Sequence, residues 1–300
     1  MKALEETEVQ PKAATATAAC PLCANPTPRA LYDVQTDACY TILRCDACSF
    51  AFAAPRPTPA QLAEFYSSTY FKRQNVIPFG YAEYRGVAEA NARHMWGFLS
   101  KTYLTGAAET GCRILDVGCA TGAFLAEAQR AGWTATGVEL SADMVDVARK
   151  EFGVNVLHAD LSSESLAPNS FDVITMWHVL EHLIDPVAAI ARANELLVAG
   201  GKLYIELPNW NSLGRMAKGT SWSQLRPPEH INFFTPRSLA SLIGRSGFRI
   251  FSCGTAYPSL RDKARVRRAS QPIHLLVGAA AVAAERLGWG GYIRLFAGKL

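Results

Sequence analysis

The chain has 300 residues, of which 49% are hydrophobic and 19% charged, and its formal net charge is +4. This size and apolar content suit one large domain, or one domain with a small additional module. Residues 261–268 hold five basic side chains and one acidic one, so the rest of the chain is neutral. A surface that binds polyanions through general positive charge is therefore excluded.

Residues 1–18 are polar and rich in alanine and threonine, with three glutamates near the start. They lack the basic start and the apolar stretch of a secretory signal, so we expect a disordered tail. The longest uncharged run, Ala269–Ala284, has 16 residues, fewer than the ~20 that span a bilayer. We therefore expect a cytoplasmic protein.

Residues 19–55 contain two Cys-x-x-Cys pairs separated by 21 residues. Two such pairs supply four thiolates to one tetrahedral zinc ion, and the segment Tyr40–Arg44 between them is predicted as a strand. With sulfur at every position the metal has no open site, so its role would be structural. Two disulfides or free thiols are the alternative, and a cytoplasmic location disfavours disulfides. The predicted zinc ligands are Cys20, Cys23, Cys45 and Cys48.

Residues 56–104 are interpreted as a linker and a helical cap. The proline-rich stretch Pro55–Ala60 predicts a stiff connection, and Leu62–Tyr70 and Tyr81–Tyr103 are predicted helices. These helices are expected to cover a cofactor that is bound by residues 105–257.

The most informative stretch is Ile114–Phe124, where an apolar strand ends in an acid and enters a turn of small residues. The helix Phe124–Ala131 follows at once, so backbone N–H groups and a helix N-terminus converge on one point. A second acid, Glu139, lies 21 residues beyond Gly118 and ends the predicted strand Thr134–Val138. A carboxylate at that position can hold the two hydroxyls of a ribose, so the pattern predicts a nucleoside-containing cofactor.

The small residues of the turn distinguish between cofactors. A dinucleotide fingerprint counted from Gly118 requires glycine where the chain has Ala120 and Ala123. Asp116 precedes the turn, and a carboxylate there is unfavourable beside a pyrophosphate but favourable beside an ammonium group. S-adenosylmethionine has an ammonium group and no phosphate, so the pattern favours it. Cys119 is expected to contribute only its backbone, the alternative being a catalytic thiol.

Two further apolar runs continue the alternation of strands and helices. Val154–Asp160 is the third predicted strand, and its final acid, followed by Leu161, could bind the amino group of adenine and pack on the ring. Phe171–Trp177 is the fourth strand and runs into the motif His178–Pro186. Strands that alternate with helices in this way indicate an α/β fold.

In these motifs the chain resembles the class I S-adenosylmethionine-dependent methyltransferases, over about residues 80–257. Ala120 stands where the family usually has glycine. The resemblance implies a Rossmann-like α/β sheet of seven strands in the order 3-2-1-4-5-7-6 and an activity of class EC 2.1.1.-. It rests on Leu115–Gly122, Gly137–Ser141, Asp160, Phe171–Ile174 and Leu180–Leu183. It implies the cofactor-binding residues Asp116, Gly118, Cys119, Ala120, Gly122, Glu139, Leu140, Asp160, Leu161 and Trp177.

A zinc ribbon before such a core is similar to a subgroup that includes sugar C-methyltransferases and proteins encoded among polysaccharide or natural-product genes. An alcohol or carbon acid must lose a proton, so a base is expected near the carboxyl ends of the strands. His178 and His230 are favoured because imidazole titrates near neutral pH, and Glu181 and His182 are further candidates. In related quinone O-methyltransferases this region can hold a divalent metal, which Glu181 and His182 could bind. His178, Glu181 and His182 also match an inverted zinc-protease pattern. That pattern needs a helix carrying both histidines, whereas His178 directly follows a strand.

The elements after the fourth strand complete the sheet. Residues 208–235 form a long segment with several aromatic side chains. These side chains either stack on a sugar or ring substrate or hold the segment in place by packing. Those aromatic residues include Trp210, Trp222, Phe233 and Phe234. The predicted elements are the helix Pro186–Val198 ended by Gly200-Gly201, the strand Lys202–Leu207, the helix Pro236–Ser246, and the strands Phe248–Ala256 and Ile293–Phe296.

Residues 258–300 are predicted to form an insertion, with the basic cluster 261–268 and the apolar helix Ile273–Leu287, and then the last strand. Cations followed by an apolar helix can contact an anionic membrane, here through residues 261–288 and at its inner face. The alternatives are a helix packed on the domain and a dimer contact. The sequence does not predict an oligomeric state.

The favoured function is methyl transfer to oxygen or carbon of a small molecule, a sugar or a lipid-linked glycan intermediate. An RNA methyltransferase that grips RNA with its ribbon would need a basic ribbon, whereas residues 19–57 hold three arginines and three aspartates. An NAD-dependent oxidoreductase is disfavoured by the glycine pattern and by Asp116. A cofactor-binding partner subunit without catalysis is the remaining alternative.

Overall fold

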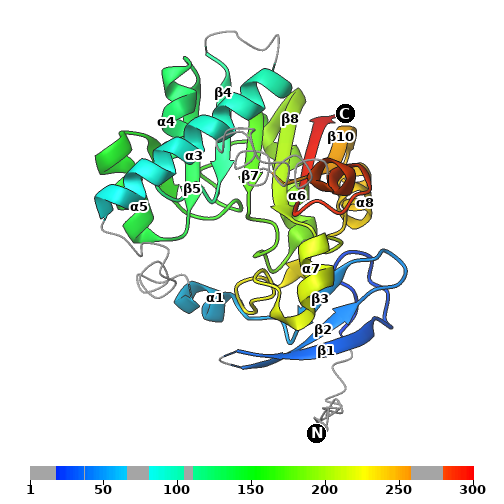
Figure 1. Cartoon of the computed structure of the whole chain (residues 1–300). Helices are drawn as coiled ribbons and strands as arrows, with labels where there is room; N and C mark the ends of the chain where they lie inside the picture. Colours follow the sequence, from blue (N-terminus) through cyan, green and yellow to red (C-terminus); the bar gives the residue numbers. More distant parts are fainter. Residues whose placement is uncertain (1–17, 37, 66–80, 105–110, 258–279) are drawn as a thin grey trace, which may run out of the picture.

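The computed structural model describes residues 18–36, 38–65, 81–104, 111–257 and 280–300. The predicted tail 1–18 lies almost wholly outside these residues, as do the end of the predicted helix Leu62–Tyr70 and the basic cluster 261–268. Figure 1 shows a large sheet flanked by helices and, at one end of it, a smaller sheet that contains the N-terminal strands.

Seven strands form the large sheet, in the order β6-β5-β4-β7-β8-β11-β10. Numbered along the chain, this is the order 3-2-1-4-5-7-6, which confirms the predicted fold. All neighbours are parallel except β11, which pairs antiparallel with β8 and β10. The order reverses between β4 and β7, and ligands of such sheets bind at that point. The strands are β4 (Arg113–Val117), β5 (Thr134–Glu139), β6 (Asn155–His158), β7 (Phe171–Trp177), β8 (Leu197–Pro208), β10 (Phe248–Ala256) and β11 (Tyr292–Lys299).

Helices cover both faces of this sheet, because successive side chains of a strand point to opposite faces. In β4, Ile114 packs in the hydrophobic cluster that includes α3, α4 and α5, whereas Leu115 packs in the cluster that includes α6 and α8. The helices are α1 (Pro59–Phe65), α3 (Tyr81–Thr102), α4 (Ala123–Arg130), α5 (Ala142–Phe152), α6 (Pro186–Leu196), α7 (Leu213–Lys218) and α8 (Pro236–Arg245).

Local capping residues set the helix ends. The Ser141 hydroxyl accepts a hydrogen bond from the N–H of Met144 in the first turn of α5, and Gly153 ends that helix with a φ of 66°. Asp185 caps α6 in the same way, directly before Pro186. Thr235 forms a capping box at the start of α8. The last two signals explain why the starts of α6 and α8 agree with the prediction.

The junction between α6 and β8 differs from the prediction. The helix ends at Leu196 instead of Val198, and Leu197 is already extended and paired with Phe171 of β7. Leu197 is fully buried. The spacing of apolar residues along a helix does not reveal that such a residue pairs with a distant strand. Gly200-Gly201 therefore lies within the strand and does not end the helix.

The small sheet is antiparallel, with the order β1-β2-β3-β9. Its first three strands are β1 (Arg29–Gln35), β2 (Cys39–Arg44) and β3 (Ala51–Ala54), and β2 confirms the predicted strand Tyr40–Arg44. The fourth, β9 (Asn232–Phe233), comes from the long segment between β8 and α8. The N-terminal module therefore shares its sheet with the core.

Residues 208–235 are held by aromatic packing against this sheet. The side chains of Trp210, Phe233 and Phe234 are at most 3% exposed, and Trp222 is 7% exposed. Trp210, Trp222 and Phe233 belong to one cluster with side chains of β2 and β3. The structure thus favours the packing interpretation of these aromatic residues over stacking on a substrate.

The C-terminal residues form a strand that lies between β8 and β10 in the large sheet. Residues 280–286 are the described end of the predicted apolar helix Ile273–Leu287, and Ala281 and Ala284 are buried. The last strand runs over Tyr292–Lys299, longer than the prediction. Within the described ranges, no helix is long and apolar enough to cross a membrane.

Candidate functional site

A cavity of about 290 Å³ lies at the carboxyl ends of β4, β5 and β7, where the strand order reverses. It is lined by seven of the ten predicted cofactor-binding residues and by His178 and His182, and none of its described lining residues is Lys or Arg. A second cavity of about 1050 Å³ adjoins it beside α1 and α6 and shares Leu140, Asp160, Leu161 and Leu183. The seven residues are Gly118, Ala120, Glu139, Leu140, Asp160, Leu161 and Trp177.

The turn after β4 requires small residues. Gly118 has a φ of 67°, and a Cβ there would lie 2.9 Å from Cγ2 of Val179. Ala120 has a φ of 46°, a left-handed conformation that disfavours a side chain. Gly122 does not line the cavity; a Cβ there would lie 2.6 Å from Cγ2 of Val154, so this glycine serves the packing of α4.

Cys119 contributes backbone and packing. Its side chain is 6% exposed, and a Cβ on Gly137 would lie 2.4 Å from its sulfur. Burial, with the nearby charges of Asp116 and Glu139, raises the pKa of the Cys119 thiol well above its usual range. A nucleophilic thiolate is therefore unfavourable here.

Asp116 is a buried carboxyl at the end of β4. It is 4% exposed and accepts a hydrogen bond of 2.6 Å from the Thr175 hydroxyl. Burial raises the pKa of Asp116 to about 7, and the charge of Glu139 adds to this, while the Thr175 hydrogen bond opposes it. A cation bound nearby would favour the ionised carboxylate.

Glu139 is held in place by backbone groups. Its carboxylate accepts the N–H of Ala120 at 3.0 Å and the N–H of Ser141 at 2.8 Å. These bonds fix the carboxylate at the end of β5 while it still lines the cavity, so it is preorganised to accept hydroxyl hydrogens from a ligand.

His178 follows β7 and carries two carboxylate neighbours. Its Nδ1 lies 3.3 Å from Oε1 of Glu181, and its Nε2 lies 3.5 Å from Oε1 of Glu206. Burial opposes protonation, but the two carboxylates raise the pKa of His178 to about 10. The residue also has a φ of 55°, a left-handed backbone that is typical of functional sites. The raised pKa favours the protonated, positively charged form of His178 at neutral pH.

His182 and His230 differ in position. His182 lines the cavity, and its Nδ1 lies 2.9 Å from the carbonyl of Glu229, so in the neutral ring the proton sits on Nδ1 and the lone pair on Nε2. His230 is 4% exposed, does not line the cavity, and its Nδ1 contacts the carbonyl of Gln224. Burial, with the charge of His182, lowers the pKa of His230 to about 3.

Glu181, His182 and His230 form a further group. Their donor atoms all lie within 4.8 Å of one another, which suits one divalent cation with nitrogen and oxygen ligands. Burial alone would raise the pKa of Glu181, but the neighbouring His178 and His182 lower it to about 2. Glu181 therefore acts in the structure as a buried carboxylate surrounded by imidazoles.

Comparisons with known proteins agree with this geometry. A profile of the methyltransferase domain matches residues 88–252, which is more than half of the chain. The chain belongs to this methyltransferase family. The resemblance to S-adenosylmethionine-dependent methyltransferases is thereby confirmed, and the profile leaves out the N-terminal module.

Two relatives of this methyltransferase are ubiquinone biosynthesis O-methyltransferases. The one from Xanthomonas euvesicatoria pv. vesicatoria (strain 85-10) is 33% identical over 169 residues, which are 52% of this chain and 71% of the relative. The one from Methylococcus capsulatus is 34% identical over 105 residues, which are 33% of this chain and 44% of the relative.

Solved structures share the fold at low sequence identity. The magnesium protoporphyrin IX methyltransferase (ChlM) from Synechocystis PCC 6803 with bound SAH has a TM-score of 0.55 and 16% identity, with 81% of this chain and all of that chain covered. The [4+2]-cyclase SpnF has a TM-score of 0.56 and 22% identity, covering 82% of this chain and 98% of that one. A cyclase among the neighbours means that the fold alone does not define the reaction.

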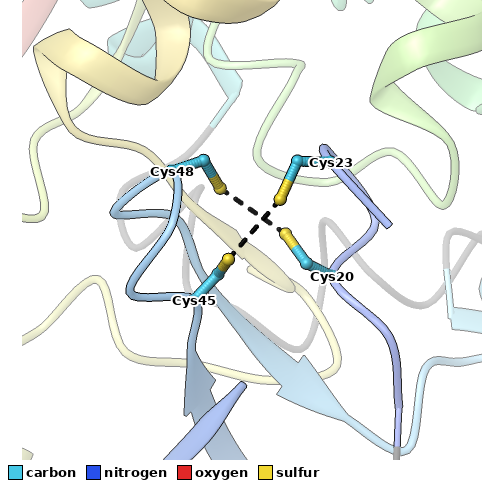
Figure 2. A group of neighbouring side chains, drawn as sticks. All are labelled: Cys20, Cys23, Cys45 and Cys48. Carbon is cyan, nitrogen blue, oxygen red and sulfur yellow. Dashed lines mark hydrogen bonds between the residues drawn. The ribbon is translucent and has the colours of Figure 1, made fainter. Parts of the chain in front are cut away.

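The four predicted zinc ligands of the methyltransferase point to one centre (Figure 2). The Sγ atoms of Cys20 and Cys48 are 3.6 Å apart, and those of Cys23 and Cys45 are 3.5 Å apart. Sulfur ligands at ~2.3 Å from a tetrahedral zinc ion would be about 3.8 Å apart. All eight cysteines are free, so the cluster is not a pair of disulfides. Its donor set and spacing fit zinc.

Two charged residues near His178 were not predicted. Glu206, at the end of β8, is 7% exposed and pairs with Arg294 of β11. Arg294 also lies over the Phe98 ring, 4.1 Å from its centre. Tyr292 places its ring 5.0 Å from that of His178. The available signal was Glu206 itself, the one charged residue in the run Leu203–Pro208.

Proposed function

We propose that the protein transfers a methyl group from S-adenosylmethionine to oxygen or carbon of a small-molecule acceptor, with a quinone precursor, a sugar and a lipid-linked glycan intermediate as candidates. The observation that carries this proposal is the cavity at the switch point of the sheet. Its lining includes the carboxylates of Glu139 and Asp160 and no Lys or Arg among the described residues, and Asp116 is buried nearby at the end of β4, which suits an ammonium and a ribose and not a pyrophosphate. The relatives described above are O-methyltransferases, which favours oxygen as the acceptor atom.

The residues present fit this cofactor. Asp116 would supply the counter-charge of the ammonium group, and Glu139 would accept the ribose hydroxyls. Leu140 and Leu161 would flank the adenine, and Asp160 would accept its amino hydrogens. All but Asp116 line the cavity, and Asp116 is buried two residues before Gly118 in the chain. When bound, the cofactor supplies an activated methyl group on a sulfonium.

The protein must then align the acceptor and manage its proton. As the acceptor oxygen forms its bond to the methyl carbon, the carbon–sulfur bond breaks, and the acceptor proton passes to a base. Each ring nitrogen of His178 faces a carboxylate, so its N–H groups are directed at Glu181 and Glu206 and not at an acceptor oxygen. His182 lines the same cavity with its lone pair on Nε2, so we propose it as the first candidate for the base.

We further propose that the four cysteines bind one structural zinc ion. The support is their mutual spacing and the free state of all four thiols. Hydrogen bonding from Cys48 lowers the pKa of Cys20. The measurement that tests this proposal is the zinc content per chain by elemental analysis.

We also propose that the protein is cytoplasmic and contacts a membrane peripherally. The basic cluster that suggested it lies outside the described residues. Leu213 and Met216 of α7 and Leu287 and Trp289 of the C-terminal segment are each at least 40% exposed. The N–H of Leu213 donates to the carbonyl of Trp289 at 3.0 Å, so the two segments adjoin, and an exposed apolar surface of this kind suits an interface.

One experiment separates the function classes. The purified protein is incubated with methyl-labelled S-adenosylmethionine and host extract, which is then split into RNA, lipid and small polar fractions. An Asp116→Ala variant is the inactive control. Label in the lipid or small polar fraction supports the proposal, and label in RNA would replace it with an RNA methyltransferase. Cofactor binding without label in any fraction would favour a non-catalytic subunit.

A further inference from the structure

The segment 178–185 forms one wall of the cofactor cavity. It joins β7 to α6 without regular secondary structure. Val179, His182 and Leu183 line the cavity, and Val179 also packs over Gly118, the first glycine of the cofactor turn. The position of this segment therefore decides the shape of the cavity.

The backbone carbonyls of this segment are held from outside, first by β9. The Asn232 side chain donates to the carbonyl of Leu180 at 3.0 Å and to that of Leu183 at 2.7 Å. The backbone N–H groups of Ile231 and Asn232 both donate to the carbonyl of Glu181, each at 3.0 Å. Three carbonyls are thus bound by two neighbouring residues of β9 and its flank.

Arg56 provides the second anchor. Its Nη2 donates to the carbonyl of Leu183 at 3.1 Å, to that of Ile184 at 2.6 Å, and to Oδ1 of Asn232 at 3.0 Å. Removing the guanidinium would leave these acceptors without this donor in a partly buried site, which is unfavourable. Arg56 and Asn232 therefore act as one clamp on the segment.

Hydrogen bonds connect Arg56 and Asn232 to the N-terminal module that holds the four cysteines, here called the cysteine module. Arg56 follows β3 by two residues, and β3 pairs antiparallel with β9. The N–H of Ala53 donates to the carbonyl of Ile231 at 3.0 Å. At the other end of β3, the N–H of Cys45 donates to the carbonyl of Phe50, so the second cysteine pair begins the turn that leads into the strand.

The cost of burying the Arg56 guanidinium is only partly compensated by hydrogen bonds. Its Nε and Nη1 have no hydrogen-bond partner within the described residues. Burial lowers the pKa of Arg56 to about 10. A partly buried cation with unpartnered donors is unfavourable for stability, which agrees with a role of Arg56 in positioning the segment it binds.

We propose that the cysteine module is part of the cofactor site: Arg56 is a positioning residue that holds segment 178–185, so occupancy of the module by zinc raises the affinity for the cofactor. The inference rests on the proposed function, since it assumes both zinc in the module and the cofactor in the cavity. Two sites joined through one segment influence each other's binding to the same extent, so cofactor should also tighten zinc binding.

The test compares Arg56→Gln with Arg29→Gln in the zinc-loaded full chain. Arg29 lies in the same module, where its side chain is exposed and pairs with Asp46 at 3.7 Å, so it is the matched control. We expect Arg56→Gln to weaken binding of S-adenosylhomocysteine, measured by calorimetry, about tenfold or more, and Arg29→Gln to leave it unchanged. Hydrogen exchange should quicken in residues 178–185 of Arg56→Gln alone, while β1 to β3 keep their protection.

A purely structural role of Arg56 makes the opposite prediction. Equal affinity in the two variants, or faster exchange throughout the module with no change in affinity, would overturn the proposal. Arg56→Lys, which retains the charge and can donate to the same carbonyls, should restore part of the affinity. As a measurement on the unaltered protein, zinc affinity should rise when S-adenosylhomocysteine is present, and no change would also overturn the proposal. Absence of binding to the unaltered protein would instead refute the proposed function.

Discussion

Asp116 gives the cofactor site a pH dependence that can be calculated. Its pKa is about 7 in the free protein because it is buried. The cofactor's ammonium group would bind only the ionised carboxylate well, so binding releases a proton from the protonated fraction. Affinity should therefore fall as the pH is lowered through 7. It should also fall above the pKa of an α-amino group, which is about 7.7–8.0.

The size of the effect follows from the ionised fraction. With a pKa of about 7, roughly three-quarters of Asp116 is ionised at pH 7.5 and about one-tenth at pH 6, so affinity should fall about eightfold. Stability of the free protein should change in the opposite direction. The folded pKa lies above the unfolded value, so the unfolded state holds fewer protons between about pH 4 and 7, and the group's contribution to stability is lost as pH rises through 7.

Calorimetric titration with S-adenosylmethionine at pH 6, 6.5, 7 and 7.5 measures this dependence. Asp116→Asn should remove the acidic limb and weaken binding at pH 7.5 by about 2 kcal/mol or more, which is about 30-fold. Asp172→Asn is the matched control, because Asp172 pairs with Arg113 and does not line the cavity. An affinity that is constant from pH 6 to 7.5 in the unaltered protein would refute the assignment of Asp116 to the ammonium group.

Four further predictions address the other parts of the molecule. Gly118→Ala places a Cβ 2.9 Å from Val179 and should weaken cofactor binding about tenfold, with the double variant that also carries Val179→Ala recovering part of it; unchanged binding would contradict the tight turn. His182→Gln should lower kcat by about 10²–10⁴ while cofactor affinity stays similar, and an equal loss in His230→Gln would contradict the assignment of the base. The purified protein should contain one zinc per chain, and chelation should lower its melting temperature; a zinc-free protein with the same melting temperature would contradict a structural metal. Trp289→Ser should weaken binding to anionic lipid vesicles in a sedimentation assay, whereas equal binding would argue against a membrane contact through that surface.

The sequence predicts those parts of the fold that depend on local patterns. The strands Phe171–Trp177 and Phe248–Ala256 have the predicted bounds, because apolar runs between turn residues define buried strands. The start of α8 follows from Thr235 and Pro236, which are capping signals. The turn after β4 is equally local, and Gly118 and Glu139, which were chosen from spacing, both line the cavity.

Contacts between distant residues could not be predicted in this way. Asn232 lies in an apolar run, and its partners Leu180 and Leu183 are 52 and 49 residues away. A buried amide must find hydrogen-bond partners, so the sequence signals that Asn232 has some, but it does not say which. The same holds for β9, which has only two residues and is a strand because β3 lies beside it.

The charges around His178 determine how its variants should be interpreted. Glu206 is balanced by Arg294 as well as by His178, whereas Glu181 depends on His178 and the neighbouring His182. Replacing His178 by glutamine therefore removes a positive charge beside a buried carboxylate, which is itself destabilising. A loss of activity in that variant alone does not identify a base. The double variant with Glu181→Gln removes both charges, so recovered stability in it would show that the loss of stability in His178→Gln comes from the uncompensated carboxylate.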